Sequence, residues 1–169
     1  LCGGTGSSPF LTKGDLAYVR CTACGFVQAD MSPEEFERRN ETELSASPEE
    51  FAPKANDPRR SRRYRKRLAA LESFRTHGLI VELGSNCGAF LLAAREAGWA
   101  GIGIEPVEAC ARHAREHHDL DVRTCVLKDA ELESGSCDVV YAHAVLEHLT
   151  SPREVLSEVA RILRPGGAL

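Results

Sequence analysis

The sequence has no long hydrophobic run: none of its apolar stretches approaches the roughly 20 residues that a membrane-spanning helix needs. No leader with a basic start and an apolar centre is visible. An excess of positive charge is also lacking, because the formal net charge is -4 at pH 7. Composition therefore creates no general attraction to nucleic acid. We expect neither a membrane nor a nucleic acid as a partner.

Methionine is nearly absent, occurring only at Met31, and the chain begins with Leu1 and stops at Leu169, where a strand should be starting. We interpret it as a fragment that lacks both ends of a longer protein. Its seven cysteines are an odd number, and they are spread along the chain rather than packed as in a small disulfide-bonded domain. This usage favours a reducing, cytoplasmic setting.

The most informative segment is an apolar run from Leu79 to Leu83 that ends at a turn containing two glycines, Gly84 and Gly88. A strand, a tight turn and a helix start of this kind present backbone N–H groups to a nucleotide-like ligand. A second short apolar strand, 101–104, ends at Glu105. An acid about 20 residues after the turn lies where a ribose-binding carboxylate belongs.

Two common nucleotide motifs are missing from this turn. The dinucleotide fingerprint G-x-G-x-x-G fails because Asn86 takes the place of the second glycine, where a side chain would crowd a pyrophosphate. No Gly-Lys-Ser/Thr follows, which excludes a P-loop. A nicotinamide-dependent oxidoreductase is therefore disfavoured.

The pattern Glu82-x-Gly84-x-x-x-Gly88 instead resembles the first motif of class I S-adenosylmethionine-dependent methyltransferases. Further stretches resemble later motifs of that family in order, namely 128–131, 137–149 and 161–167. Each motif alone also fits an ordinary turn, but the ordered series, over roughly residues 75 to 169, favours the family. The resemblance implies S-adenosylmethionine as cofactor, bound by Glu82, Gly84, Ser85, Asn86, Gly88, Glu105, Pro106, Asp129 and Ala130.

A finer resemblance concerns the acceptor. The version Ser85-Asn86-x-Gly88 is similar to that of sugar C-methyltransferases, although Cys87 stands where those enzymes more often have an acid. It implies a nucleotide-linked sugar as the leading small-molecule acceptor. The alternative is a zinc-ribbon binding protein whose methyltransferase-like domain is a non-catalytic scaffold. Donor binding that depends on Glu105 would distinguish the enzyme from the scaffold.

From residue 79 onward, predicted strands and helices alternate, which is typical of βαβ units. We predict a doubly wound Rossmann-like parallel sheet, truncated after the start of its fifth strand. The expected strands are 79–83, 101–104, 121–127, 137–142 and one beginning at 168, and the expected helices are 88–97, 106–117 and 152–163.

The chain is expected to have three parts: a zinc-ribbon-like module at 1–30, a helical linker at 31–77 and the cofactor-binding domain at 78–169. Three helix starts mark the linker, at Ser32-Pro33, Ser47-Pro48 and Asp57-Pro58, because each pairs a capping side chain with proline in the first turn. The third helix is expected to run to about residue 76.

Cys21-Thr22-Ala23-Cys24-Gly25 has the spacing of a zinc knuckle, in which two thiolates approach one ion. Cys2-Gly3-Gly4 looks like the end of a second knuckle, as in the zinc modules of some sugar C-methyltransferases. We predict a structural zinc held by Cys2, Cys21, Cys24 and a cysteine upstream of Leu1. Small buried thiols or a redox pair are the alternatives, and core packing is expected for the other four cysteines.

Seven cations lie between Arg59 and Arg67. The simplest interpretation is a solvated helix end that faces the acidic stretch before it; the alternative is a site for a phosphate-bearing acceptor or a nucleic acid. His143 follows the strand 137–142 at the edge where open α/β sheets bind ligands, so it is the candidate catalytic base, or else it shapes the cofactor pocket. Three further histidines, His113, His117 and His118, are expected to face solvent.

Overall fold

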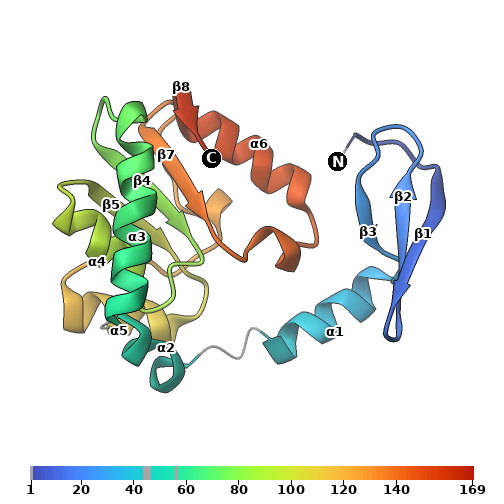
Figure 1. The fold of residues 1–169 in the computed structure, drawn as a ribbon, viewed down its shortest axis with the longest axis horizontal. Helices are drawn as coiled ribbons and strands as arrows, with labels where there is room; N and C mark the ends of the chain where they lie inside the picture. Colours follow the sequence, from blue (N-terminus) through green and yellow to red (C-terminus); the bar gives the residue numbers. More distant parts are fainter. Residues whose placement is uncertain (1, 44–46, 56) are drawn as a thin grey trace. The chain divides into compact units, whose positions relative to one another are not determined.

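The computed structural model describes residues 2–43, 47–55 and 57–169. The chain forms two compact units, one made of Leu1–Ser45 with Thr150–Arg153 and the other of Ala46–Leu149 with Glu154–Leu169 (Figure 1). None of the helices in these described ranges is long and apolar enough to cross a membrane.

The first unit contains a three-stranded antiparallel sheet in the order β1 (Ser7–Lys13), β2 (Leu16–Cys21) and β3 (Val27–Ala29), followed by helix α1 (Pro33–Glu43). Helix α1 starts as expected, because the Ser32 hydroxyl accepts a hydrogen bond from the Glu35 N–H at 3.2 Å.

The second unit is built on five parallel strands in the order β6-β5-β4-β7-β8. These strands are β4 (Leu79–Leu83), β5 (Ala100–Ile104), β6 (Asp121–Arg123), β7 (Cys137–Ala142) and β8 (Leu163–Ala168). The helices of this unit are α2 (Pro48–Ala55), α3 (Pro58–Leu71), α4 (Ala89–Glu96), α5 (Glu108–His118) and α6 (Pro152–Ile162). This order, with helices on both faces, confirms the predicted doubly wound parallel sheet.

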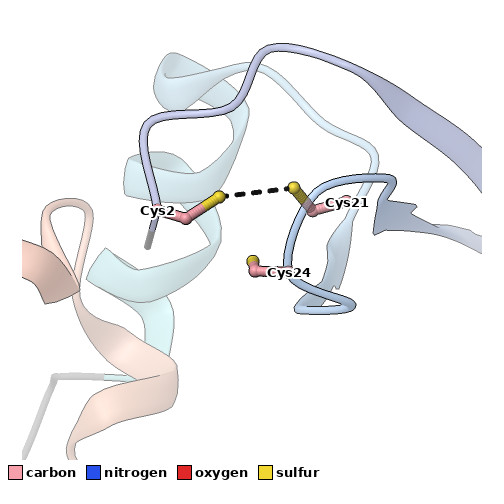
Figure 2. A group of neighbouring side chains, drawn as sticks. All are labelled: Cys2, Cys21 and Cys24. Atoms are coloured by element: carbon pink, nitrogen blue, oxygen red, sulfur yellow. Dashed lines mark hydrogen bonds between the residues drawn. The ribbon is translucent and has the colours of Figure 1, made fainter.

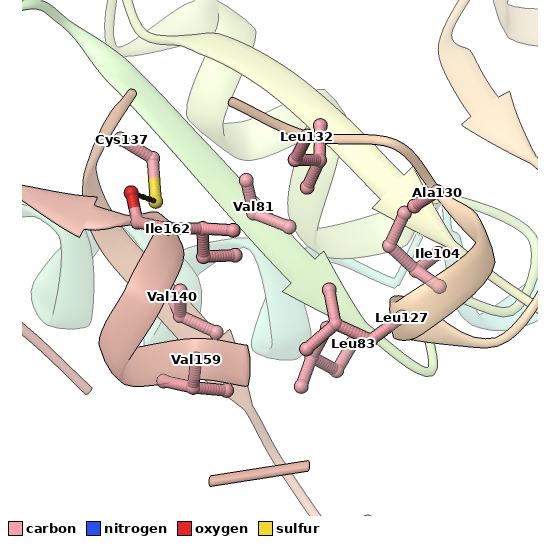
Figure 3. Packing of buried hydrophobic residues seen from close by; sticks show 10 residues of the cluster. All are labelled: Val81, Leu83, Ile104, Leu127, Ala130, Leu132, Cys137, Val140, Val159 and Ile162. Atoms are coloured by element: carbon pink, nitrogen blue, oxygen red, sulfur yellow. Dashed lines mark hydrogen bonds between the residues drawn. The ribbon is translucent and has the colours of Figure 1, made fainter. Parts of the chain in front are cut away.

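Alternate residues of the central strands bury side chains on opposite faces of the sheet, because the side-chain period of a strand is two. On one face, Val81 and Val140 pack with Val159 and Ile162 of α6 (Figure 3). On the other face, the core contains Ile80 and Val139 of the sheet, Leu68 of α3, and Phe90 and Ala93 of α4. Both faces are therefore apolar, as a parallel sheet covered by helices requires.

Three predicted boundaries are wrong. The strand expected at 121–127 ends at Arg123, because Arg123 pairs with Ile104, the last residue of the neighbouring strand β5, and β6 forms the edge of the described sheet. The last strand begins at residue 163 rather than 168, and residues 164–167 form an irregularity between its two paired positions. The third helix ends at residue 71 and continues only as a short 3-10 turn, Glu72–Phe74.

One charged side chain, Asp138 of β7, is completely buried at the N-terminal edge of this sheet. Its Oδ2 accepts hydrogen bonds from the backbone N–H of Thr76 at 2.9 Å and of Gly78 at 2.6 Å. The Arg164 guanidinium donates to Oδ1 and also to the Phe74 carbonyl oxygen. Burial opposes ionisation, but the Thr76 N–H, the Arg164 guanidinium and the Gly78 N–H outweigh it and lower the pKa of Asp138 to about 2.

We predict that Asp138→Asn lowers the free energy of unfolding by about 3 kcal/mol, because Arg164 loses its charge partner in a buried position. In the wild type, the folded pKa lies below the unfolded one, so the stabilisation is complete above about pH 5. We expect about 2–3 kcal/mol to be lost as the pH falls from about 4 toward 2.

Urea unfolding of the wild type and the variant between pH 2 and 7 measures both effects. The matched control is Asp121→Asn, since Asp121 is exposed and lies at 4.0 Å from Arg123. Equal unfolding free energies for Asp138→Asn and the wild type at pH 7 would contradict the prediction.

Candidate functional site

The turn after β4 has several residues with positive φ angles, and these positions hold residue types that adopt such angles readily. Gly84, Asn86 and Gly88 have positive φ values of 66°, 46° and 81°. A Cβ atom on Gly88 would lie 2.3 Å from a methyl carbon of Leu120, so this position needs glycine. Asn86 tolerates the left-handed region, and its side-chain amide donates to the Gly84 carbonyl oxygen at 3.2 Å. Its side chain is thus directed back onto the turn.

Glu105 joins this turn to the end of β5. Its side chain is buried, with Oε2 accepting from the Asn86 N–H at 2.8 Å and Oε1 from the Val107 N–H at 2.9 Å. Burial raises the pKa of Glu105, and the two N–H groups act in the opposite direction. A carboxylate offers about four acceptor positions, so each oxygen can still accept one hydroxyl of a ribose.

Two buried polar atoms near the turn have no hydrogen-bond partner among the described residues: Glu82 Oε2 and Ser85 Oγ. Burial, and then the nearby charge of Glu105, raise the pKa of Glu82 well above its ordinary value. Leaving a buried polar atom unpaired costs about 1–3 kcal/mol, which a ligand carrying hydroxyl and amino groups would offset. The residues at this turn therefore fit an adenosine-containing cofactor such as S-adenosylmethionine.

Sequence reasoning missed the role of Gly103 in β5. A Cβ atom there would lie 2.6 Å from Ser85 Oγ, so the missing side chain is what lets Ser85 fit beneath the turn. The detectable signal was a glycine within a strand, which often marks a close approach.

The remaining predicted cofactor residues lie at the ends of neighbouring strands. Pro106 is exposed and directly follows Glu105. Asp129 and Ala130 end the 3-10 turn Leu127–Asp129 after β6, with Asp129 exposed and Ala130 buried. The Arg123 guanidinium donates to the Ala130 carbonyl oxygen, which ties this segment to the last residue of β6.

His143 is exposed and directly follows β7. The loop that carries it approaches the turn after β4, because a Cβ atom on Gly84 would lie 2.9 Å from Val145 Cγ2. Ala144 has a φ of 55°, which is rare for alanine and is the kind of backbone strain that clusters at functional sites. The structure thus brings His143 to the same edge of the sheet as Gly84 and Glu105.

Aromatic rings lie between the core under α3 and α4 and His143. Tyr141 lies parallel to Phe90, with ring centroids 3.8 Å apart, and the His143 ring is near-parallel to Tyr141 at 6.4 Å. Arg67 of α3 donates a hydrogen bond to the Tyr141 hydroxyl. Burial raises the pKa of Tyr141, and the charge of Arg67 opposes this. Arg67 and Tyr141 are therefore further candidates near the acceptor.

In the first unit, Cys2, Cys21 and Cys24 converge (Figure 2). Their sulfur atoms all lie within 4.8 Å of one another, and Cys2 and Cys21 are 3.7 Å apart. Tetrahedral zinc with bonds of about 2.3 Å places its sulfur ligands about 3.8 Å apart, so this donor set fits the metal. Backbone N–H groups of Cys24 and Ala23 lower the pKa of Cys21 to about 7, which favours the thiolate that zinc binds.

Comparison with known proteins agrees with the geometry of the second unit. A protein-family model described as "Methyltransferase domain" matches residues 81–169. A probable S-adenosylmethionine-dependent methyltransferase of Mycolicibacterium smegmatis is 39% identical over 67 residues, covering 39% of this chain and 26% of that protein. The C-methyltransferase NovU of Streptomyces niveus is 32% identical over 96 residues, which cover 53% of this chain and 22% of NovU.

Among solved structures, the complex between the Haloferax volcanii Trm112 methyltransferase activator and a putative methyltransferase matches with a TM-score of 0.53 and 28% identity, over 70% of this chain and 57% of that one. The chain spans only 16% to 44% of the lengths of the curated relatives it matches. With the family model covering more than half of the chain and the cofactor turn in place, the chain belongs to the class I S-adenosylmethionine-dependent methyltransferases.

Proposed function

We propose that the protein transfers a methyl group from S-adenosylmethionine to a small acceptor. The observation that carries this proposal is the pair of buried, unpaired atoms, Glu82 Oε2 and Ser85 Oγ, beside a turn held by Glu105. A non-catalytic scaffold has no need for such atoms, which cost stability without a ligand. When bound, the cofactor supplies an electrophilic methyl group on its sulfonium.

Each part of the cofactor would be bound by a different group of residues. Glu105 accepts hydrogen bonds from the ribose hydroxyls, and the absent side chains of Gly84 and Gly88 let the backbone approach the cofactor. Glu82 and Ser85 meet its polar groups below the turn. Pro106, directly after Glu105, would border the adenosine at the end of β5, and Asp129 with the backbone of Ala130 would border it after β6.

His143 would act at the acceptor. Methyl transfer is an in-line displacement, so the enzyme must align the acceptor atom and remove its proton where it carries one. An exposed imidazole at the C-terminal end of β7 can do either, because one of its ring nitrogens can accept a proton while the other donates a hydrogen bond. The ring of Tyr141 lies between those of Phe90 and His143, so it would limit the positions that the His143 imidazole can take.

A nucleotide-linked sugar is the acceptor that we favour. The Ser85-Asn86-x-Gly88 turn and the cysteine cluster support it, because both resemble features of sugar C-methyltransferases. The match to a C-methyltransferase supports methyl transfer to a carbon atom. The basic part of α3 adds a physical argument: none of its seven cations forms an ion pair with an acid in the described ranges. Arg67 donates a hydrogen bond to the hydroxyl of Tyr141, one residue before the end of β7, so this cation lies near the ligand-binding edge, where it would attract phosphate groups.

We further propose one structural zinc ion in the first unit, held by Cys2, Cys21 and Cys24 with a fourth cysteine upstream of Leu1. Four thiolates leave no open coordination position, so the metal would stabilise the three-stranded sheet rather than take part in methyl transfer.

The first prediction from this proposed function concerns the donor. Glu105→Ala should lower the affinity for S-adenosylhomocysteine by about 1.5–3 kcal/mol, the scale of hydrogen bonds to a charged group. Isothermal titration calorimetry on the full-length protein measures this, with Glu96→Gln as control because Glu96 is an exposed acid at the end of α4. Unchanged affinity in Glu105→Ala would remove Glu105 from the site, and tight NADH binding without S-adenosylhomocysteine binding would reject the proposed function.

The second prediction concerns His143. We expect His143→Ala to reduce turnover by about 10²–10⁴-fold with donor affinity nearly intact, because general base catalysis contributes on that scale. The assay supplies radiolabelled S-adenosylmethionine and a panel of nucleotide-linked sugars. A collapse of donor affinity, with turnover at saturation preserved, would instead assign His143 to the cofactor pocket.

The third prediction concerns the metal. Full-length protein purified without chelator should contain one zinc per chain by elemental analysis, and Cys21→Ser should reduce that content, because the metal loses one of its thiolates. Cys125→Ser is the matched control, since Cys125 lies in the other unit. Zinc-free wild-type protein would defeat the proposal.

A further inference from the structure

Helices α2 and α5 of the second unit are neighbours (Figure 1). A cavity of about 530 Å³ lies between them. One wall is formed by α2 and the other by three histidines of α5; its lining residues are Pro48, Glu49, Ala52, Pro53, His113, His117 and His118. The expectation that these histidines face solvent is wrong for His113 and His118, which are half-buried. Half of the six histidines of the chain thus meet at one place outside the methyl-transfer site.

His113 and His117 are four residues apart and share one face of α5. Their rings are stacked, with centroids 4.2 Å apart and planes at 12°. His117 Nδ1 lies 3.3 Å from the His113 carbonyl oxygen. Because a carbonyl can only accept, Nδ1 must carry the proton, and the Nε2 of a neutral His117 then has a free lone pair. A backbone carbonyl that orients the second nitrogen is typical of metal-binding histidines.

A third histidine lies beside this pair. The ring centroid of His118 is 5.5 Å from that of His113, with the two planes at 71°. The Nε2 of His118 is buried and has no hydrogen-bond partner among the described residues, although such an atom normally has one.

A carboxylate faces these rings from the other helix. Glu49 lies in the first turn of α2, is exposed, and interacts electrostatically with His113. Its pKa is lowered, first by its own backbone N–H and then by the Ser47 hydroxyl, so it is ionised at neutral pH. Among the described residues, only the cysteine cluster already has three ligand atoms within 4.8 Å of one another. Metal binding at the histidines therefore requires both the exposed Glu49 side chain and the stacked imidazole rings to turn from the positions they have here.

We propose that His113 and His117 of α5, together with Glu49 of α2, bind a divalent transition-metal ion. Two imidazoles and one carboxylate suit Zn²⁺, Co²⁺ or Ni²⁺, and the absence of a thiolate at this site distinguishes it from the cysteine cluster. The ion would cross-link α2 to α5. The site is independent of methyl transfer, since it includes none of the residues assigned to the donor or acceptor.

The test is a calorimetric titration of the full-length protein with Ni²⁺ after one equivalent of Zn²⁺ has been added to fill the cysteine cluster. We expect one further equivalent to bind, and the melting temperature to rise with added Ni²⁺. His117→Gln should remove both effects while leaving the fold intact, because His117 is exposed. Glu49→Gln should weaken binding without abolishing it, and His77→Ala is the control because His77 lies outside the cavity lining.

Three results would overturn the proposal. One is that no further equivalent of Ni²⁺ binds to the wild type, and another is that binding is unchanged in His117→Gln. The third is that His117→Gln and His77→Ala weaken binding equally, which would indicate general surface histidine binding. Methyl transfer and S-adenosylhomocysteine affinity are measured separately, so the outcome does not depend on the proposed function.

Discussion

The second unit depends on one buried charge, the carboxylate of Asp138 at the N-terminal edge of the sheet. It accepts hydrogen bonds from the segment before β4 and from Arg164 at the start of β8, so one side chain holds three stretches that are far apart in sequence. An ionised group in a buried position is tolerable only when donors surround it in this way. With this edge held, β4 and β7 are in register, and their opposite ends deliver Gly84 and His143 to one place.

The carboxyl groups at the two edges of the sheet differ in pKa because their hydrogen-bond partners differ. Asp138 is buried among donors, and its pKa falls to about 2. Glu82 is buried without a partner for one oxygen, and its pKa rises well above the ordinary value. Glu105, between these cases, accepts two backbone N–H bonds that shape the cofactor turn. Both oxygens of the structural carboxylate, Asp138, accept hydrogen bonds, whereas Glu82 and Ser85 at the candidate functional edge each keep an unpaired polar atom for a ligand.

Local sequence patterns predicted those elements whose limits are set by local chemistry. The strands 79–83 and 137–142 were predicted with the observed bounds, because each is an apolar run ended by a turn or a polar segment. The end of β6 was not predictable, since it depends on where its neighbour β5 stops. The irregular start of β8 has a similar cause: Leu163 pairs with Cys137, so a residue pattern typical of a helix end was incorporated into the sheet.

The sequence by itself determined the parallel α/β architecture, the glycine turn with its acid after the second strand, and the cysteine spacing. These features follow from short-range periodicity and from residues with special backbone freedom. Only the tertiary structure decided which polar atoms remain unpaired, why Gly103 must lack a side chain beside Ser85, and that His113 and His118 lie in a cavity facing Glu49. Such facts depend on contacts between segments distant in the chain, because burial and pairing arise only when helices and strands pack together.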